Sequence, residues 1–251
     1  MKRSFLFPVG LLILWQLCSV LGILPRSVIP SPVHIIAALY ELLAEGLPRG
    51  STLNMHCLYS LLRVACGFML AASVGVPLGI LCGWSRTVRD MLTPIIETLR
   101  PIPPLAWIPL AILWFGIGLT SATFIIFLGC FFPILLNTIS GVVSVEPILI
   151  NAARTLGASD RQIFLHVLLP GATPAIYTGL RIGLGIGWMT LVAAEFTGVK
   201  SGYGLGYMIM TARDIQRPDL VLAGMAVIGL TGFLLDCIVR LFEARALRWR
   251  S

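Results

Sequence analysis

Residues 101–145 read PIPPLAWIPLAILWFGIGLTSATFIIFLGCFFPILLNTISGVVSV, a run of 45 residues without a charged side chain. An α-helix rises about 1.5 Å per residue, and a bilayer crossing takes about 20 apolar residues. The run is therefore long enough for two crossings, with a natural turn at Gly116-Ile-Gly-Leu-Thr-Ser-Ala122. This stretch predicts a protein that crosses a membrane at least twice.

The composition extends this prediction to the whole chain. Its 251 residues are 57% hydrophobic and 12% charged, and the mean hydropathy is +0.94. A soluble domain carries about 25% charged residues, so a soluble enzyme and a disordered tail are excluded. Further spans are expected at 4–25, 64–85 and, more weakly, at 172–195 and 219–241. We predict an all-α membrane protein of about six transmembrane helices, forming one transmembrane domain over residues 1–251.

The cations are distributed unequally between the two ends of these spans. If the N-terminus is cytoplasmic, the inner set is Lys2, Arg3, Arg86, Arg89, Arg100, Arg154, Arg161, Arg240, Arg245, Arg248 and Arg250. The outer set is Arg26, Arg49, Arg63, Lys200, Arg213 and Arg217. The excess of cations in the inner set satisfies the positive-inside rule, so we expect both termini in the cytoplasm. Cations that only flank spans form no continuous basic stripe, which excludes nucleic-acid binding.

Two segments between the spans have helical signals of their own. Residues 31–46 begin with Ser31 and Pro32, a helix start, and place Ile36, Leu39, Tyr40 and Leu43 on one face. This amphipathic helix lies on the outer membrane surface or packs over the rim of the bundle; the pattern fits both. The prolines of residues 100–109 interrupt a helix near the inner surface. Each frees a carbonyl, so this region is expected to be buried within the bundle.

Small residues recur at four-residue intervals in two of the predicted spans. The first stripe is Gly67, Ala71, Gly75, Gly79 and Gly83, and the second is Gly179, Gly183 and Gly187. Such faces let helix backbones approach closely in lipid, so we predict packing surfaces. A surface that slides during transport is the alternative.

The segment 146–170 predicts a pair of short helices. Pro147 starts the first and Gly157 ends it, while Ser159 and Gln162 form a capping box for the second, which should end before Pro170. Helices of about ten residues span about 15 Å, too little for a bilayer. An apolar stripe on the first helix comprises Ile148, Leu149, Ala152 and Leu156. We interpret the pair as a docking surface for another protein, or as a loop packed under its own bundle.

This segment resembles a known family motif. Asn151-Ala152-Ala153-Arg-Thr-Leu-Gly157-Ala158, followed at the matching distance by Val167-Leu-Leu169-Pro170, resembles the EAA loop of binding-protein-dependent ABC importer permeases. That pattern has Glu where this chain has Asn151 and Ile where it has Val167. The resemblance implies that the residues that couple to the ATPase are Asn151, Ala152, Ala153, Gly157, Ala158, Leu169 and Pro170.

Other stretches resemble the nitrate, sulfonate and taurine branch of these permeases. They are Arg100-Pro-Ile-Pro-Pro-Leu-Ala-Trp-Ile-Pro-Leu, Gly179-Leu-Arg-Ile-Gly, Gly187-Trp-Met-Thr-Leu-Val-Ala-Ala-Glu195 and Gly202-Tyr-Gly-Leu-Gly. The resemblance implies a type I ABC importer permease fold with cytoplasmic coupling helices, in a bacterial inner membrane. It also implies a second permease copy, cytoplasmic ABC ATPase subunits and an extracytoplasmic solute-binding protein that delivers a small anion. Another solute within the same superfamily, and a secondary transporter or channel, remain as alternatives.

The chain itself has no pattern for ATP binding. Neither of its two lysines, Lys2 and Lys200, follows a glycine, whereas a phosphate loop needs Gly-Lys-Ser/Thr. We therefore expect no enzyme activity in this chain, with ATP hydrolysed in a separate subunit. The six cysteines and three histidines are scattered, so no metal site and no cofactor is predicted.

Arg181 and Glu195 are the clear ionisable groups identified within the predicted spans. Arg181 either pairs with another span or reaches the inner interface, or it gives an anion pathway a positive potential. Glu195 is expected to anchor the glycine-rich loop at 202–206, because an acid lining the pathway would repel an anion. With Trp188 and Thr190, these residues form the candidate substrate pathway.

Overall fold

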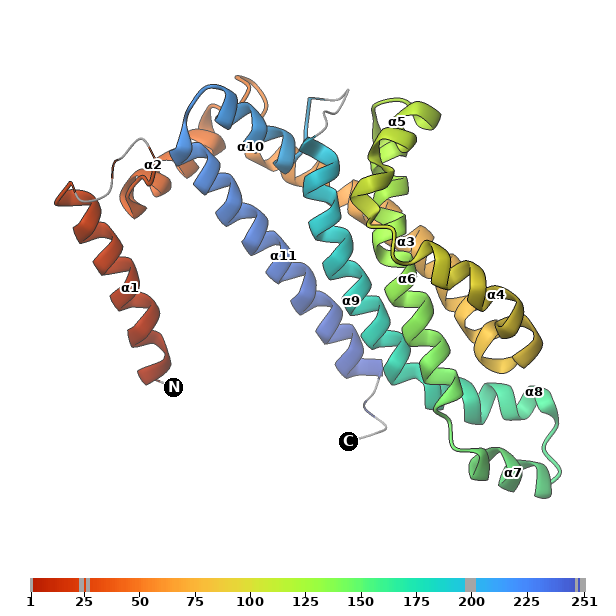
Figure 1. Ribbon diagram of the computed structural model, residues 1–251. Coiled ribbons are helices and arrows are strands. Elements are labelled where there is room, and N and C mark those ends of the chain that lie inside the picture. Colours follow the sequence, from red (N-terminus) through yellow and green to blue (C-terminus); the bar gives the residue numbers. More distant parts are fainter. Residues whose placement is uncertain (1, 23–24, 26–27, 197–201, 247, 249–251) are drawn as a thin grey trace. The chain divides into compact units, whose positions relative to one another are not determined.

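The computed structural model describes residues 2–22, 25, 28–196, 202–246 and 248 (Figure 1). Every regular element in that part of the chain is helical, which confirms the all-α class. The elements are α1 (Lys2–Val20), α2 (Pro32–Ala44), α3 (Leu53–Trp84), α4 (Arg86–Leu99), the 3₁₀ turn η1 (Pro104–Trp107), α5 (Ile108–Phe115), α6 (Leu119–Val143), α7 (Pro147–Thr155), α8 (Asp160–Ile163), the π-helical turn η2 (Phe164–Leu168), α9 (Leu169–Phe196), α10 (Leu205–Asp214) and α11 (Pro218–Ala246).

Four helical stretches are long and apolar enough to cross a membrane. They are α3, α6, α11 and the stretch Asp160–Phe196 that joins α8, η2 and α9. A fifth candidate is the pair formed by α4 and Pro104–Phe115, which is bent by 81°. The apolar part of α1, Val9–Val20, is shorter, so a sixth crossing there stays a prediction. Arg26, Lys200 and Arg250, which contribute to the charge distribution, lie outside the described residues.

The helix break predicted at the prolines after Arg100 is confirmed. The chain bends sharply there and forms η1 and the eight-residue α5. Pro101, Pro103 and Pro104 lack the backbone N–H that a helix needs, and each disfavours helical geometry in the residue before it. The predicted burial is wrong within this single chain, because Ile102 and Leu105 are exposed.

The second short helix was expected to end before Pro170, and this is also wrong. The helical path runs from Asp160 to Phe196 without interruption. Phe164–Leu168 forms a π-helical turn directly before Pro170. Because a π turn shifts the hydrogen-bond register by one residue, such a bulge is a known way to accommodate a local disturbance inside a helix.

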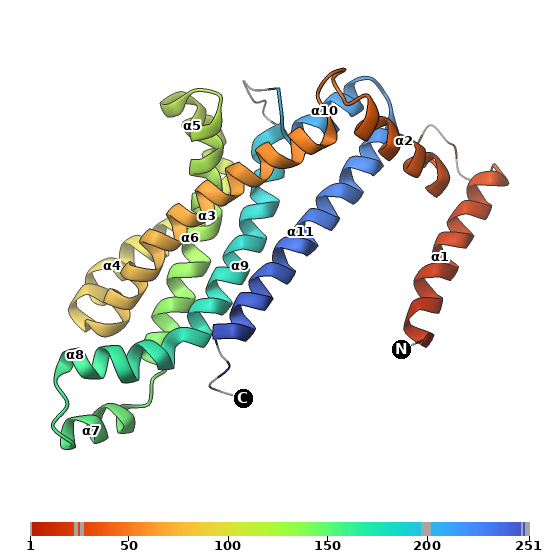
Figure 2. The ribbon, with the colours of Figure 1, turned by 180° about the vertical axis from the view of Figure 1, so that it is seen from behind.

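The described residues form two compact units. The first comprises Met1–Leu61 and Glu195–Thr231, and the second comprises Leu62–Ala194 and Gly232–Ser251. In the second unit, α6 packs between α3 and α9 (Figures 1 and 2). α7 and α8 lie beyond the end of α6 at which α9 begins (Figure 1).

Both small-residue stripes are packing surfaces against α6, as predicted. A Cβ atom at Gly79 would lie 2.6 Å from the Cβ of Thr138, and one at Gly67 would lie 2.6 Å from Ile126. On the other side of α6, a Cβ at Gly183 would lie 3.0 Å from the Cys130 carbonyl. These backbones approach closely only because the side chains are absent.

The amphipathic segment 31–46 forms α2 in the first unit. Ser31 caps its N-terminus and Pro32 occupies the first turn, as predicted. Ala38 and Leu42 are buried, whereas Ile36 and Tyr40 are exposed, so one face packs and another is free for a membrane surface. An ion pair of 2.7 Å between Glu41 and Arg217 also holds α2.

Arg217 joins α2 to the segment between α10 and α11. Its guanidinium donates to Asp219 at 2.8 Å and to Glu41 at 2.7 Å. The Asp219 carboxylate, and then that of Glu41, raise the pKa of Arg217 above its ordinary value. Arg217 therefore carries its charge throughout the physiological pH range.

Candidate coupling segment, transmembrane pocket and buried network

The chain reverses direction between α7 and α8 through local hydrogen bonds. Gly157 adopts a φ of +82°, and its N–H donates to the Arg154 carbonyl. The Ala158 N–H donates to the Ala153 carbonyl at 3.0 Å, which closes the turn. Ser159 and Gln162 then form the predicted capping box. The turn at Gly157 thus orients α7 and α8 relative to each other.

The apolar stripe on α7 is not covered by the described residues. Ile148, Leu149 and Leu156 are exposed, Leu156 to 88%. Asn151 and Ala152 are exposed on the same helix. An exposed apolar stripe of this kind is typical of a surface that binds another protein, so packing under the chain's own bundle does not account for this face.

The structure places the predicted coupling residues in two cavities and at one helix start, except Ala152, which is exposed and lines neither cavity. Asn151 lines a cavity of about 590 Å³ together with Arg89 and Arg154. Ala153, Gly157 and Ala158 line a second cavity of about 440 Å³. Leu169 and Pro170 are partly buried at the start of α9 and belong to neither lining. These two residues therefore belong to the helix that supports the segment.

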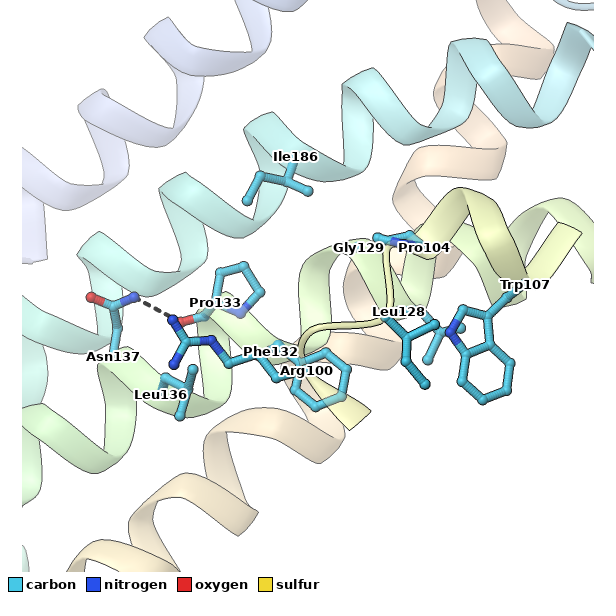
Figure 3. A pocket seen from close by; sticks show the side chains of 11 residues that line it. Arg100, Pro104, Trp107, Leu128, Gly129, Phe132, Pro133, Leu136, Asn137 and Ile186 are labelled. Carbon is cyan, nitrogen blue, oxygen red and sulfur yellow. Dashed lines mark hydrogen bonds between the residues drawn. The ribbon is translucent and has the colours of Figure 1, made fainter. Parts of the chain in front are cut away.

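A further cavity of about 540 Å³ lies in the second unit, and sequence analysis did not single it out (Figure 3). We call it the Arg100 pocket. Its walls come from the segment after α4, from α6 and from α9: Arg100, Ile102, Pro104, Trp107, Leu128, Gly129, Phe132, Pro133, Leu136, Asn137 and Ile186. The sequence signal is the proline-rich run after Arg100, which predicts a helix break and a buried region and resembles the nitrate, sulfonate and taurine branch, but which does not indicate a cavity.

Arg181 pairs with another span. Its Nε lies 2.7 Å from Oδ1 of Asp236 on α11, and Oδ2 of Asp236 accepts from Arg240 at 2.8 Å. Asp236 lies within the expected span 219–241 but was missed there as an ionisable group. Arg63, expected at an outer end, lies buried within α3. The charge of Arg181 is matched by a carboxylate in the described structure.

Replacing Arg181 should therefore have a small effect on uptake and on assembly of the transporter. In Arg181→Gln, Asp236 keeps its bond to Arg240, so we expect normal assembly and near wild-type uptake in the reconstituted transporter. Asp236→Asn should be more damaging, because it removes the carboxylate shared by both arginines. A large uptake loss in Arg181→Gln with normal assembly, and partial retention in Arg181→Lys, would instead support a role in the pathway.

Trp188 and Thr190 face different neighbours on α9. Trp188 is buried against α11, where a Cβ at Gly232 would lie 2.7 Å from its indole nitrogen. It lines a small cavity of about 120 Å³ with Arg181. Thr190 donates to the Ile186 carbonyl and packs against Gly129, which lines the Arg100 pocket. Thr190 thus packs behind Gly129, a residue of the pocket wall, and does not line the pocket itself.

Glu195 belongs to a buried network in the first unit. Its Oε1 accepts from the hydroxyl of Ser60 at 2.8 Å, and its Oε2 accepts from the Gly206 N–H at 2.8 Å. Ser60 also accepts from the Leu205 N–H at 2.9 Å. The hydrogen bond to Gly206 agrees with the prediction that Glu195 anchors the loop at 202–206.

Membrane-length helices packed through glycine stripes, together with an exposed helix pair at one end, are features of a membrane transport permease. A family model for the binding-protein-dependent transport system inner membrane component matches residues 75–248. The chain belongs to this family. It is a permease subunit of an ABC importer and not an enzyme, and its family works with ATPase subunits and a solute-binding protein.

The relatives support this assignment over nearly the whole chain. An ABC transporter permease of Methanocaldococcus jannaschii is 46% identical, covering 97% of this chain and 90% of the relative. The taurine transport system permease protein of Escherichia coli is 43% identical, with 96% and 87% covered. The nitrate import permease protein of Synechocystis is 39% identical, with 93% and 85% covered.

Solved structures support the fold. A chain of the MetNI methionine ABC transporter in an inward-facing conformation superposes with a TM-score of 0.59 at 23% identity. The match covers 73% of this chain and 93% of that chain. The fold is therefore that of a type I ABC importer permease, as the sequence motifs implied.

Proposed function

We propose that this permease imports a small oxyanion-bearing solute: a sulfonate such as taurine, or a nitrate-like anion. The similarity to relatives named for taurine and for nitrate carries this proposal. Sulfonate and nitrate share a compact group of oxygen atoms with a delocalised negative charge. One pathway chemistry therefore serves both solutes.

We further propose that two copies of the chain form the membrane-spanning part of the transporter. Separate ATPase subunits dock on the exposed stripe of α7 and on the turn at Gly157, and they hydrolyse the ATP. An extracytoplasmic protein delivers the solute. The exposure of Ile148, Leu149 and Leu156 supports the docking of a partner at this segment.

Uptake by the complete transporter tests the solute class. The permease, its ATPase and its binding protein are reconstituted in proteoliposomes with ATP inside. We expect saturable uptake of labelled taurine, an alkanesulfonate or nitrate, with competition by the other oxyanions and none by methionine. Uptake of methionine with no uptake of any oxyanion would overturn the proposed solute class.

The proposed orientation has both termini and α7 in the cytoplasm. Cys57, near the start of α3, is then close to the outer surface, whereas Ser159 lies at the exposed inner turn. In intact cells, a membrane-impermeant thiol reagent should modify Cys57 but not Ser159→Cys, which should react only in inverted vesicles. Met55→Cys, exposed in the same turn as Cys57, provides a more accessible outer position. Labelling of position 159 from outside would reverse the orientation.

A further inference from the structure

The Arg100 pocket contains a cation whose charge is not matched. The ion pairs among the described residues include Arg181 and Arg217, but none includes Arg100. No acidic residue lines the pocket, and most of its walls are apolar or aromatic. Arg100 is itself exposed in the described chain, but the apolar walls beside it exclude water on one side, so its attraction for an anion in the cavity is screened less than in open water.

The pocket also offers neutral hydrogen-bond donors. The side-chain amide of Asn137 donates one N–H to the Pro133 carbonyl at 2.8 Å, and the described residues provide no acceptor for the second (Figure 3). Trp107 contributes an indole from η1 to the same lining. A compact oxyanion accepts from several donors at once, so Arg100 and Asn137 suit such a ligand.

A purely local role for Arg100 is the competing explanation. Arg100 is the C-terminal capping residue of α4, and a cation at that end of a helix is favourable. That role requires only a charge near the last turn. It does not account for the position of Arg100 in a cavity of about 540 Å³ shared with α6 and α9, a volume within the range of about 300–1,000 Å³ that is usual for small-molecule sites.

We propose that the Arg100 pocket is a binding site for the oxyanion group of the transported solute, contacted by Arg100 and Asn137, with Leu136 and Phe132 beside its apolar part. This proposal rests on the proposed oxyanion function. It assigns the positive potential of the pathway to Arg100, because the charge of Arg181 is already matched by Asp236.

Uptake of labelled taurine or nitrate by the reconstituted transporter provides the first test. Arg100→Gln should reduce uptake by about tenfold or more, and Arg100→Lys should retain part of it, since Lys keeps the charge but loses the planar pair of donors. Arg86→Gln is the matched control, because it removes the same charge from the other end of α4, which is exposed like Arg100 but does not line the pocket. If the wild type transports and Arg100→Gln equals Arg86→Gln, Arg100 only caps its helix and the proposal is overturned.

A charged thiol probe provides a second test that does not depend on transport. In Asn137→Cys, we compare the reaction rates of the 2-sulfonatoethyl and the 2-trimethylammonioethyl methanethiosulfonates, with the wild type giving the background of the native cysteines. Arg100 should favour the sulfonate reagent, and adding Arg100→Gln should reduce that preference by about tenfold. An unchanged ratio would refute the site. A changed ratio without wild-type uptake of any oxyanion would refute only the proposed function.

Discussion

Gly157→Arg should leave the permease inserted in the membrane but abolish the stimulation of ATP hydrolysis by solute. Gly157 has a φ of +82°, where a residue with a Cβ is strained by about 1–2 kcal/mol. No atom lies within 4 Å of a Cβ built there, so the Cβ itself meets no clash inside the chain. It instead places a long cation between Leu156 and Ala158, on the proposed docking surface. Co-purification of the ATPase and its activity with and without loaded binding protein would measure the effect.

Two controls separate backbone strain from lost docking. Gly157→Asn places a small residue that tolerates this backbone conformation, so most coupling should remain. Gly50→Arg introduces the same side chain at another open glycine, with a φ of +89°, but far along the chain from α7. Gly50→Arg should leave coupling intact. Wild-type coupling in Gly157→Arg would show that the turn is not part of the docking surface.

The coupling segment was predictable because its signals are local. The start of α7 at Pro147, the turn at Gly157 and the capping box at Ser159 each depend on residues within a few positions. The glycine stripes were predictable for a related reason, since a four-residue spacing puts small residues on one face of any helix. Neither inference required knowledge of which helix lies opposite.

The errors arose where two local rules compete or where a partner is distant in sequence. At Pro170 the helix continues because a π turn precedes it, and hydropathy does not reveal such a shift of register. Arg181 and Asp236 are 55 positions apart, so their pairing depends on the packing of α9 on α11. The Arg100 pocket is likewise assembled from three separate segments, and no short motif contains its lining.

Glu195 illustrates how a distant residue completes a local structure. α10 begins after Gly204, which has no side chain to cap the first N–H groups. Ser60 accepts from the Leu205 N–H and Glu195 accepts from that of Gly206, so two remote side chains cap the helix. Such N–H groups, when buried, require an acceptor. The Glu195 carboxylate also accepts from the Ser60 hydroxyl, which fixes the rotamer of Ser60.

We expect Glu195→Ala to lower the thermal unfolding temperature of the purified permease more than any other change in this network. It leaves the Gly206 N–H and the Ser60 hydroxyl without their acceptor, and each buried unsatisfied group costs about 1–3 kcal/mol. Glu195→Gln should cost less, since its amide oxygen still accepts from Gly206, and Ser60→Ala should fall between the two. Glu45→Ala, at an exposed glutamate in the same unit, is the control. If Glu195→Ala and Glu45→Ala unfold at the same temperature, the carboxylate does not hold the start of α10, and its burial must serve the transport cycle instead.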